Sequence, residues 1–428
     1  MIPGPWPGAA QEADEVRPRL QELRGTWAFV TWGTMATILL VPFTNTFLPH
    51  TNRDYSVMSV TQLFFWACVL LSPRVVRRGY SSILMWMVVL FGIRYVYGWL
   101  LSDFPELMAD STRNMIRPMI WAWILAAVLR DERWRKRGCD AFVLGASLAA
   151  GLHAAGIGIT GEITGALGTQ RITAFELNPN VLGVIYATAF LIALARVIQP
   201  RTGYGLIARL AFGGSCALLM VGELLTGSRT AAVFTALGAL VLVGVEMRRA
   251  RWSLAAVFLS ALVVGGAFAA GYSDSIIGKR SENVVDSGVG SEDRARMAPI
   301  LVEQFLRSPT YGLGPENYRV ELGNRSGTGD PGVGIVAHNQ LFMFSVEMGL
   351  FGLIPFLTIC FLLLRQAWRV REEEGGLPLA LALPTVLTAC TVANIAFHWH
   401  FHFIVGLVAG AFGAYKDRRA GAQGGEAA

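Results

Sequence analysis

Charged residues are scarce in this chain. They make up 15% of its 428 residues, while apolar residues make up 53%, against roughly 25% charged residues in an average soluble domain. The apolar residues gather in about a dozen runs of roughly 15 to 25 residues, the length that an α-helix needs to cross a bilayer core about 30 Å thick. The composition argues against a soluble globular protein and predicts an all-α protein that crosses a membrane many times.

Clusters of cysteine or acidic residues that would hold a metal are also lacking. The five cysteines are scattered without CxxC or other paired spacing, so we expect neither disulfides nor a zinc site. On a helix, His398 and His402 would share one face while His400 points away, and no acidic or thiolate ligand is near them in the sequence. We expect these histidines to pack at the membrane interface, and we expect no metal and no other cofactor.

Twelve apolar runs are predicted to be transmembrane helices. They are residues 26–43, 57–72, 80–101, 115–129, 139–159, 178–198, 204–225, 230–246, 252–272, 338–364, 377–396 and 398–415. Arginine and lysine recur in every second connection, and cationic connections stay in the cytoplasm. Both tails, 1–25 and 416–428, are therefore expected inside. One long helix over 377–415 would send the basic tail outside, so we expect two helices there.

One connection is much longer than the others. Residues 273–337 lie between the ninth run and the tenth, on the outer side by the charge pattern, and hold nearly all of the contiguous polar sequence. A loop of this length usually serves a function. Residues 292–306 are expected to form an amphipathic helix, whereas residues 312–334 are rich in glycine and proline.

Several arginines lie on the outer side, where the rule that cationic connections stay in the cytoplasm does not explain them. Those on short outer connections or helix ends are Arg53, Arg113, Arg117, Arg171 and Arg229, and Arg94 lies toward the outer end of the third run. Arginine presents a permanently charged planar fork that binds phosphate through two bonds, so the set favours a polyanionic lipid headgroup such as pyrophosphate. Any single arginine could instead extend to the interface or pair with an acid, as Arg229 could with Glu223.

His338 opens the tenth apolar run, directly after the long loop. The run is longer than the roughly 20 residues needed to cross a bilayer, so its start is expected to project toward the loop. The partial positive charge of a helix N-terminus disfavours imidazolium and would keep the ring neutral, as a general base requires. A local capping or hydrogen-bonding role is the alternative.

Four motifs, taken in order, resemble those of the O-antigen ligase and polymerase superfamily of bacterial envelope glycosyltransferases. They are Asn178-Pro179-Asn180-Val181-Leu182-Gly183, then Gly227-Ser228-Arg229-Thr230, then Arg294 ahead of Ser308-Pro309-Thr310-Tyr311-Gly312-Leu313-Gly314, and finally His338-Asn339 with Glu347, Gly349 and Gly352. Helix capping alone would also account for the first motif. Together the motifs cover about the second half of the chain.

The resemblance implies a GT-C-like enzyme of the bacterial inner membrane with its active site on the periplasmic side. The donor would be an undecaprenyl-pyrophosphate-linked glycan. Within the superfamily the chain looks most like the O-antigen ligase, which transfers that glycan to lipid A-core oligosaccharide during lipopolysaccharide assembly. The transfer is expected to be inverting, and also metal-independent because no DxD sequence lies in an outer loop.

The resemblance also assigns roles to residues. His338 would be the general base, and Arg229 and Arg294 would bind pyrophosphate. Arg296 lies two positions further on, and Ala298 stands where relatives often have tryptophan, so Arg294 and Arg296 both stay candidates. Supporting roles are expected for Asn178, Asn180, Asn339 and Glu347, and contacts with acceptor phosphates for Arg53, Arg113 and Arg117.

Three other functions stay open at this point. An O-antigen polymerase or a protein O-oligosaccharyltransferase would use the same donor and the same kind of site. A transporter would place ionisable residues near mid-membrane, often in two similar halves, whereas this chain has its ionisable residues at the outer surface and no internal repeat. No basic stripe interleaved with aromatic residues is present, so no nucleic-acid partner is expected.

Overall fold

A computed structural model gives the arrangement of most of the chain. The structure describes residues 27–43, 62, 66–70, 72–164, 170–175, 177–199, 203–247, 291–326, 337, 339–390 and 398–425. Arg53, His338 and most of the apolar run at 57–72, together with the whole run at 252–272, lie outside the described residues. Within the described part the chain is helical, apart from one two-stranded hairpin.

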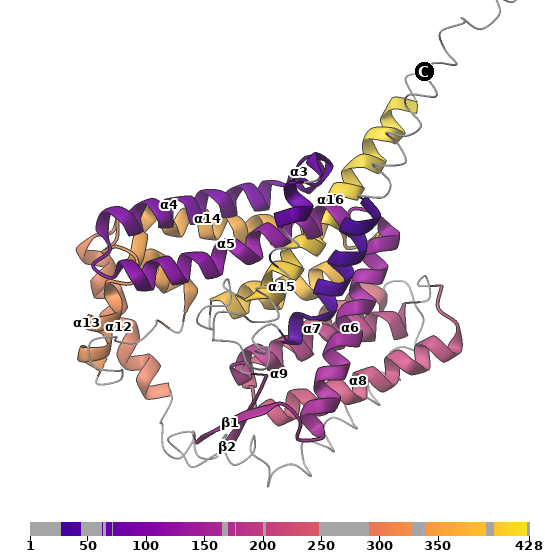
Figure 1. Ribbon diagram of the computed structural model, residues 1–428, viewed down its shortest axis with the longest axis horizontal. Coiled ribbons are helices and arrows are strands. Elements are labelled where there is room, and N and C mark those ends of the chain that lie inside the picture. Colours follow the sequence, from indigo (N-terminus) through magenta and orange to yellow (C-terminus); the bar gives the residue numbers. More distant parts are fainter. Residues whose placement is uncertain are drawn as a thin grey trace, which may run out of the picture.

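Three long helices lie side by side, as Figure 1 shows. They are α4 (Ser82–Leu101), α5 (Pro105–Val128) and α14 (Gln340–Val370), with α4 packed against both of the others. The hydroxyl of Ser81 caps α4 by accepting a backbone N–H at 3.3 Å. Proline opens α5, in the first turn, where a missing N–H removes no helical hydrogen bond.

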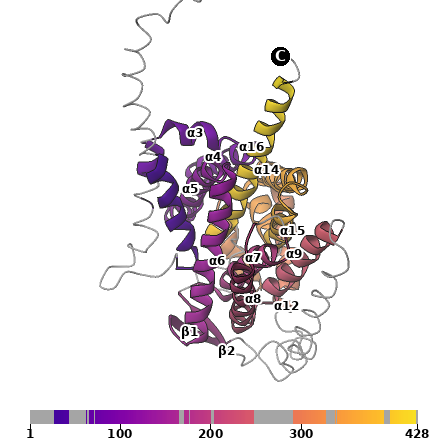
Figure 2. The same ribbon diagram turned by 90° about the vertical axis from the view of Figure 1, so that its right-hand side faces the viewer.

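A second group of helices surrounds α7 (Pro179–Ile198). The helices α6 (Glu132–Ala154), α8 (Leu206–Thr226) and α9 (Arg229–Met247) all pack against it, and Figure 2 shows α7 in the middle of the group. Most residues of α7 are buried, which fits a helix that is apolar on every face. The helix α15 (Leu377–Ala389) packs on both α9 and α14 and so joins the two groups.

The ends of the chain add shorter elements and one long helix. A helix at Trp27–Leu39 leads into the 3-10 turn η1 (Val41–Phe43), and α3 (Pro73–Gly79) packs against α5. The last helix, α16 (Trp399–Gly425), also packs against α5. It is separate from α15, so the last two apolar runs are two helices, as the charge pattern predicted.

One β-hairpin follows α6. Its strands β1 (Ile159–Thr164) and β2 (Gln170–Ala174) are antiparallel. The all-α prediction did not include this hairpin, which lies almost entirely in the connection expected between the runs at 139–159 and 178–198. Repeated Ile-Thr pairs in these strands carry the signal that was missed, since β-branched residues favour strands.

Two helices stand in the long connection. The helix α12 (Ser291–Arg307) agrees with the amphipathic helix expected at 292–306, and it buries Met297, Ile300 and Leu301. The helix α13 (Tyr318–Ser326) lies in the glycine- and proline-rich stretch, for which no helix had been proposed. The helix α12 packs against α13 and α14, at the end of the three-helix layer that lies away from α3 (Figure 1).

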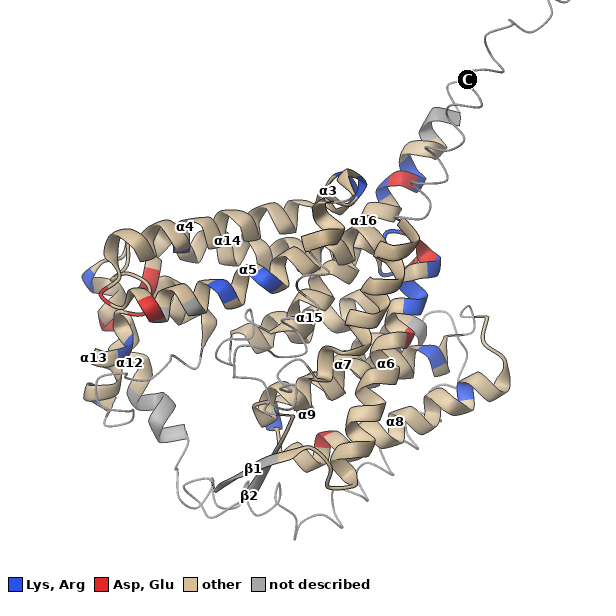
Figure 3. Cartoon of the chain, in the orientation of Figure 1, with Lys and Arg blue, Asp and Glu red and all other residues tan. Residues whose placement is uncertain are grey.

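The described part has the surface of a helical membrane protein. Four of its helices, α4, α7, α8 and α14, are long and apolar enough to cross a bilayer. Large apolar side chains are exposed along them, such as Trp99 at 70% and Ile207 at 86%. Figure 3 shows few charged residues along α4 and α14. The number of crossings, predicted as twelve, stays a prediction.

Several helices extend beyond the apolar runs that predicted them. The helix α6 begins at Glu132 rather than 139, because the carboxylate of Asp131 accepts the N–H groups of Arg133 and Trp134 at 2.9 and 3.3 Å. The helices α14 and α16 likewise continue into charged sequence. Hydropathy detects the part of a helix that suits a bilayer, so polar ends of helices are missed.

Candidate active site

Two of the four motifs meet where α7 begins and α8 passes into α9. The side-chain oxygen of Asn178 accepts the N–H of Asn180 at 2.9 Å and caps α7. The side-chain oxygen of Asn180 accepts the hydroxyl of Ser228 at 3.2 Å. The Ser228 oxygen in turn accepts the N–H of Ala231 at 3.2 Å. The start of α7 is thereby bonded to the corner that carries Arg229.

Gly183 lets α7 pass very close to this corner. A Cβ at this position would lie 2.9 Å from both the Cβ of Ala231 and the hydroxyl oxygen of Thr226, and 3.0 Å from the Cβ of Ser228. Side chains do not pack this closely, so any larger residue would push the corner away from α7.

Arg229 is the first residue of α9, and its side chain is exposed. Pairing with Glu223 was the alternative to an anion-binding role. Glu223 is instead buried and accepts the hydroxyl of Thr235 at 2.8 Å. An exposed guanidinium at a short corner is placed to meet an anionic group from outside the protein.

The third and fourth motifs also meet, at a break in α14. Gly349 has φ 59° and ψ −143° inside this helix, a conformation that residues with a Cβ rarely adopt. The break frees backbone groups that an unbroken helix would pair internally. The loop takes them up: Leu313 N–H donates to the Val346 carbonyl at 2.8 Å, Gly314 N–H donates to the Glu347 carbonyl at 3.0 Å, and Leu350 N–H donates to the Pro309 carbonyl at 2.8 Å.

A buried ion-pair cluster lies beside this break. The Arg94 guanidinium donates from Nε to Glu347 Oε2 at 2.9 Å and from Nη2 to Glu347 Oε1 at 3.1 Å. It also donates from Nη2 to Glu316 Oε1 at 2.7 Å. Its Nη1 donates to the hydroxyls of Ser111 at 2.8 Å and Thr112 at 3.2 Å. The cluster therefore joins α4, α5, α14 and the loop.

The second carboxylate of the cluster is ionised in the loop. Burial opposes ionisation of Glu316, but the neighbouring guanidiniums of Arg94 and Arg319 outweigh it and lower the pKa of its carboxyl. Arg319 Nη1 lies 3.0 Å from Glu316 Oε2. Glu316 also has φ 69°, and a residue with a side chain keeps such a backbone only where its surroundings fix it. The backbone N–H of Glu316 donates to Glu347 Oε1 at 3.1 Å, which supplies such a constraint.

Of these charged residues, the sequence singled out Glu347 as a supporting residue and noted Arg94 only by position. Glu316 was missed. The signal available was an arginine and a glutamate that each stand inside an apolar run, since buried charges in a membrane protein usually pair with one another. Nothing in the sequence indicates that a third charge would come from the loop.

Both neighbours of His338 in the sequence are held in place. The N–H of Ala337 donates to the buried Tyr318 hydroxyl at 3.2 Å. The side-chain oxygen of Asn339 accepts the N–H groups of Leu341 and Phe342 at 2.9 and 3.3 Å and so caps α14. The helix therefore begins at residue 340, two positions after the predicted start.

Four surface charges tie α13 to α12. Arg307 lies 2.8 Å from both Glu303 and Glu321, and Arg325 lies 2.6 Å from Glu303 and 3.2 Å from Glu321. Hydrogen bonds from Arg325 and Arg307 lower the pKa of the Glu303 carboxyl to about 2.

The two loop arginines proposed for pyrophosphate, Arg294 and Arg296, both lie in the first turns of α12. Positions two apart on a helix are separated by about 200° around its axis. One bound group is therefore expected to meet only one of these two positions directly.

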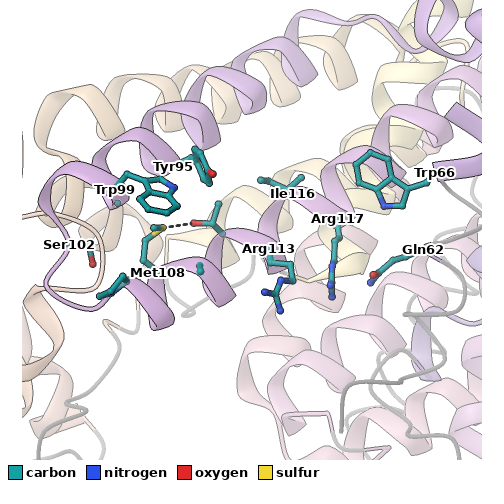
Figure 4. Close-up of a pocket in the computed structure, with 13 residues that line it drawn as sticks. Gln62, Trp66, Tyr95, Trp99, Ser102, Met108, Arg113, Ile116 and Arg117 are labelled. Atoms are coloured by element: carbon teal, nitrogen blue, oxygen red, sulfur yellow. Dashed lines mark hydrogen bonds between the residues drawn. The ribbon is translucent and has the colours of Figure 1, made fainter. Parts of the chain in front are cut away.

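A cavity of about 720 Å³ lies between α4 and α5 and includes both α5 arginines that the sequence suggested for acceptor phosphates. Figure 4 shows Arg113 and Arg117 extending to the same side of α5, while Tyr95 and Trp99 stand on α4. Met108, Ile116 and Trp66 complete most of the apolar lining.

The three histidines near the C-terminus are arranged differently from the expectation. The helix α16 begins at Trp399, so His398 precedes it, and its ring stacks with that of His400 at a centroid distance of 5.9 Å. The ring Nδ1 of His402 lies 3.1 Å from the His398 carbonyl oxygen. His400 and His402 are both buried.

These features define a helical membrane protein in which a long connection docks onto a broken helix and brings short motifs together. Residues 214–357 match the sequence model of the O-antigen ligase family, which confirms the resemblance found in the motifs. The matched range runs from α8 into α14 and includes the Arg229 corner, α12 and the break at Gly349. A comparison with curated proteins finds no match to this chain.

The matched range covers less than half of the chain. The similarity supports a function of the O-antigen ligase type in general, and it extends over residues 214–357 alone. The motif at Asn178 lies before the matched range but is bonded to it through Ser228.

Proposed function

We propose that this protein is an O-antigen ligase that transfers a glycan from undecaprenyl pyrophosphate to a sugar hydroxyl of lipid A-core oligosaccharide, at the periplasmic face of the bacterial inner membrane. The family match over residues 214–357 supports the class of reaction. The observation that carries the proposal is the docking of the loop onto the break in α14. That docking brings α12, with Arg294 and Arg296, against the helix that follows His338.

In the proposed reaction, His338 accepts the proton of the acceptor hydroxyl as that oxygen attacks the anomeric carbon of the donor glycan. A new glycosidic bond forms as the bond between the anomeric carbon and the pyrophosphate oxygen breaks. Undecaprenyl pyrophosphate leaves with the electron pair. A single displacement of this kind inverts the configuration at the anomeric carbon.

Arginines are proposed to stabilise the leaving group. Arg229, with Arg294 or Arg296, would neutralise the negative charge that develops on the pyrophosphate, a contribution of several kcal/mol in a site shielded from water. A divalent ion supplies the same stabilisation in many phosphate-releasing enzymes. This sequence has no DxD in an outer loop to hold one, so the guanidiniums carry the charge in this proposal.

The remaining candidate residues are proposed to hold backbone in place. Asn178 and Asn180 bond the corner that carries Arg229, and Asn339 caps the helix after His338. Glu347 binds Arg94 and the Glu316 N–H. In each of these bonds a side-chain oxygen holds the protein's own backbone or another of its side chains, which supports a positioning role.

The decisive experiment is transfer by purified protein from undecaprenyl-pyrophosphate-linked glycan to lipid A-core. Wild type should give glycosylated lipid A-core, and His338→Ala should be inactive although it elutes and unfolds like wild type. A folded, fully active His338→Ala would overturn the assignment of the base.

The product identifies the acceptor. Elongated polyprenyl-linked glycan in place of modified lipid A-core would show a polymerase, and glycan on a serine of an added acceptor protein would show a protein O-oligosaccharyltransferase. The family match is to O-antigen ligase, so we expect the lipid A-core product.

A further inference from the structure

The cavity between α4 and α5 combines two kinds of lining. Two guanidiniums, of Arg113 and Arg117, stand one turn apart on α5. Aromatic and aliphatic side chains also line the cavity, among them Tyr95 and Trp99 from α4 and Met108 from α5. A volume of about 720 Å³ falls within the 300 to roughly 1,000 Å³ typical of small-molecule sites.

The two arginines lie deep along their helix. At a rise of about 1.5 Å per residue, Arg113 is about 12 Å and Arg117 about 18 Å from the first residue of α5. Beside α5 runs α4, a helix able to cross a bilayer. Ionisable residues along the helices of a membrane protein usually face a polar cavity or one another, and they often mark a ligand site or pathway. Both arginines line the cavity.

The lining fits a phosphorylated sugar that carries acyl chains. Guanidinium groups spaced by one helical turn suit phosphate oxygens, which arginine binds through two parallel bonds. Exposed aromatic rings such as Trp99, 70% exposed, and Tyr95, 47% exposed, offer flat apolar faces to sugar rings and to chains. The phosphorylated glucosamine end of lipid A has all three parts: phosphate, sugar ring and acyl chain.

We propose that this cavity binds the phosphorylated, acylated sugar end of the acceptor glycolipid. The assignment to the acceptor rests on the proposed function, because that reaction joins two anionic lipids and the donor pyrophosphate is assigned to arginines on α9 and α12. Thr112 lines the cavity and also accepts a hydrogen bond from Arg94 at 3.2 Å. The bound acceptor would therefore lie against the cluster that orders the loop.

Binding of lipid A to the full-length protein in phosphatidylcholine nanodiscs tests the proposal. The ligands are bisphosphorylated lipid A, the same lipid A after removal of its phosphates, and undecaprenyl phosphate. The double variant Arg113→Gln/Arg117→Gln should weaken binding of bisphosphorylated lipid A by about tenfold or more. It should leave binding of the dephosphorylated lipid and of undecaprenyl phosphate nearly unchanged.

Two further variants distinguish binding in the cavity from the general effect of removing a positive charge from the protein. Arg77→Gln removes an exposed arginine from α3 and should bind bisphosphorylated lipid A like wild type. Ala109→Trp fills the cavity from an exposed position on α5 without changing charge, and it should weaken binding of lipid A with and without phosphates. This second variant keeps the test decisive if the double variant fails to fold.

Each outcome decides the proposal. Unchanged binding of bisphosphorylated lipid A in both cavity variants would overturn it, and so would a loss confined to undecaprenyl phosphate, which would make the cavity a donor site. If the proposed function is wrong but the cavity assignment is right, lipid A will bind in an arginine-dependent way, yet no glycan will be transferred to it.

Discussion

Arg94 and Glu347 form a doubly bonded ion pair across 253 positions of sequence, with N···O distances of 2.9 and 3.1 Å and almost no exposure of either side chain. The pair joins α4 to the short part of α14 that precedes the Gly349 break. Because Glu316 binds the same guanidinium, the pair also holds the loop. Substitutions in this cluster are therefore expected to affect both the stability of the protein and the docking of the loop.

Removing one member of the pair should destabilise the protein strongly. For Glu347→Gln or Arg94→Met we expect a loss of about 3–5 kcal/mol, because a buried charge would be left without its partner. The measurement is thermal unfolding of the purified protein in detergent. Lys136→Gln is the matched control, since Lys136 pairs with Glu132 at the surface and such a pair contributes about 0–1 kcal/mol. Equal losses in the buried and surface variants would contradict the prediction.

Gly349→Ala should release the loop. The added Cβ would lie 2.5 Å from the Pro309 carbonyl oxygen and from Thr310, and φ 59° would be strained by roughly 1–3 kcal/mol. We expect faster proteolysis within residues 308–314 together with loss of transfer activity. Gly92→Ala in α4 has open space at its Cβ and should be neutral in both assays. Normal activity and protection in Gly349→Ala would show that the break is dispensable.

Acid should weaken the contact between α12 and α13. The carboxyl of Glu303 has a folded-state pKa of about 2, below its ordinary value of 4.5, so it contributes stability above about pH 4.5 and loses it as the pH falls toward 2. The difference in Tm between wild type and Glu303→Gln should be present at pH 7 and shrink below about pH 4. A difference that stayed constant over this range would mean that the ion pairs contribute nothing. High salt should shrink it at pH 7 as well.

Transfer should proceed in excess EDTA. If guanidiniums neutralise the leaving pyrophosphate, the initial rate should be the same with EDTA as with magnesium. The assay measures the glycosylated acceptor at matched ionic strength. A requirement for magnesium would remove the charge-neutralising role from the arginines.

The arginines themselves should differ in how they tolerate substitution. Arg229→Gln is expected to lower kcat by roughly 100-fold, by analogy with the removal of one oxyanion-stabilising donor, and Arg229→Lys should restore only part, because a lysine lacks the planar fork. Arg294→Gln and Arg296→Gln, measured separately, should show unequal losses, since the proposal assigns pyrophosphate binding to one of the two. Equal and small losses in all of these variants would place pyrophosphate elsewhere.

Much of the helical architecture follows from local sequence. The apolar runs at 80–101, 178–198 and 204–225 correspond closely to α4, α7 and α8, because bilayer-length apolar stretches have few alternatives to a helix. The period of apolar residues at 292–306 predicted α12 for a similarly local reason. Asn178 was expected to begin a helix and does so.

The features that build the site were much less predictable. Glu316 lies 222 positions from Arg94, and no local pattern reports a contact between residues so far apart. The loop that docks on α14 uses backbone groups freed by one glycine, which hydropathy does not register. The sequence therefore contains the motifs but did not show how Gly312-Leu313-Gly314 and Gly349 fit together.

The break at Gly349 divides α14 into a segment of about 13 Å and a longer one that continues to Val370. The longer segment must adapt its tilt to the thickness of the bilayer. The shorter one is fastened to the loop and to Arg94 instead. A change of temperature or of lipid composition that thins the bilayer would therefore tilt the longer segment, while the short one keeps its orientation, so that the geometry of the proposed site is insulated from the membrane around it.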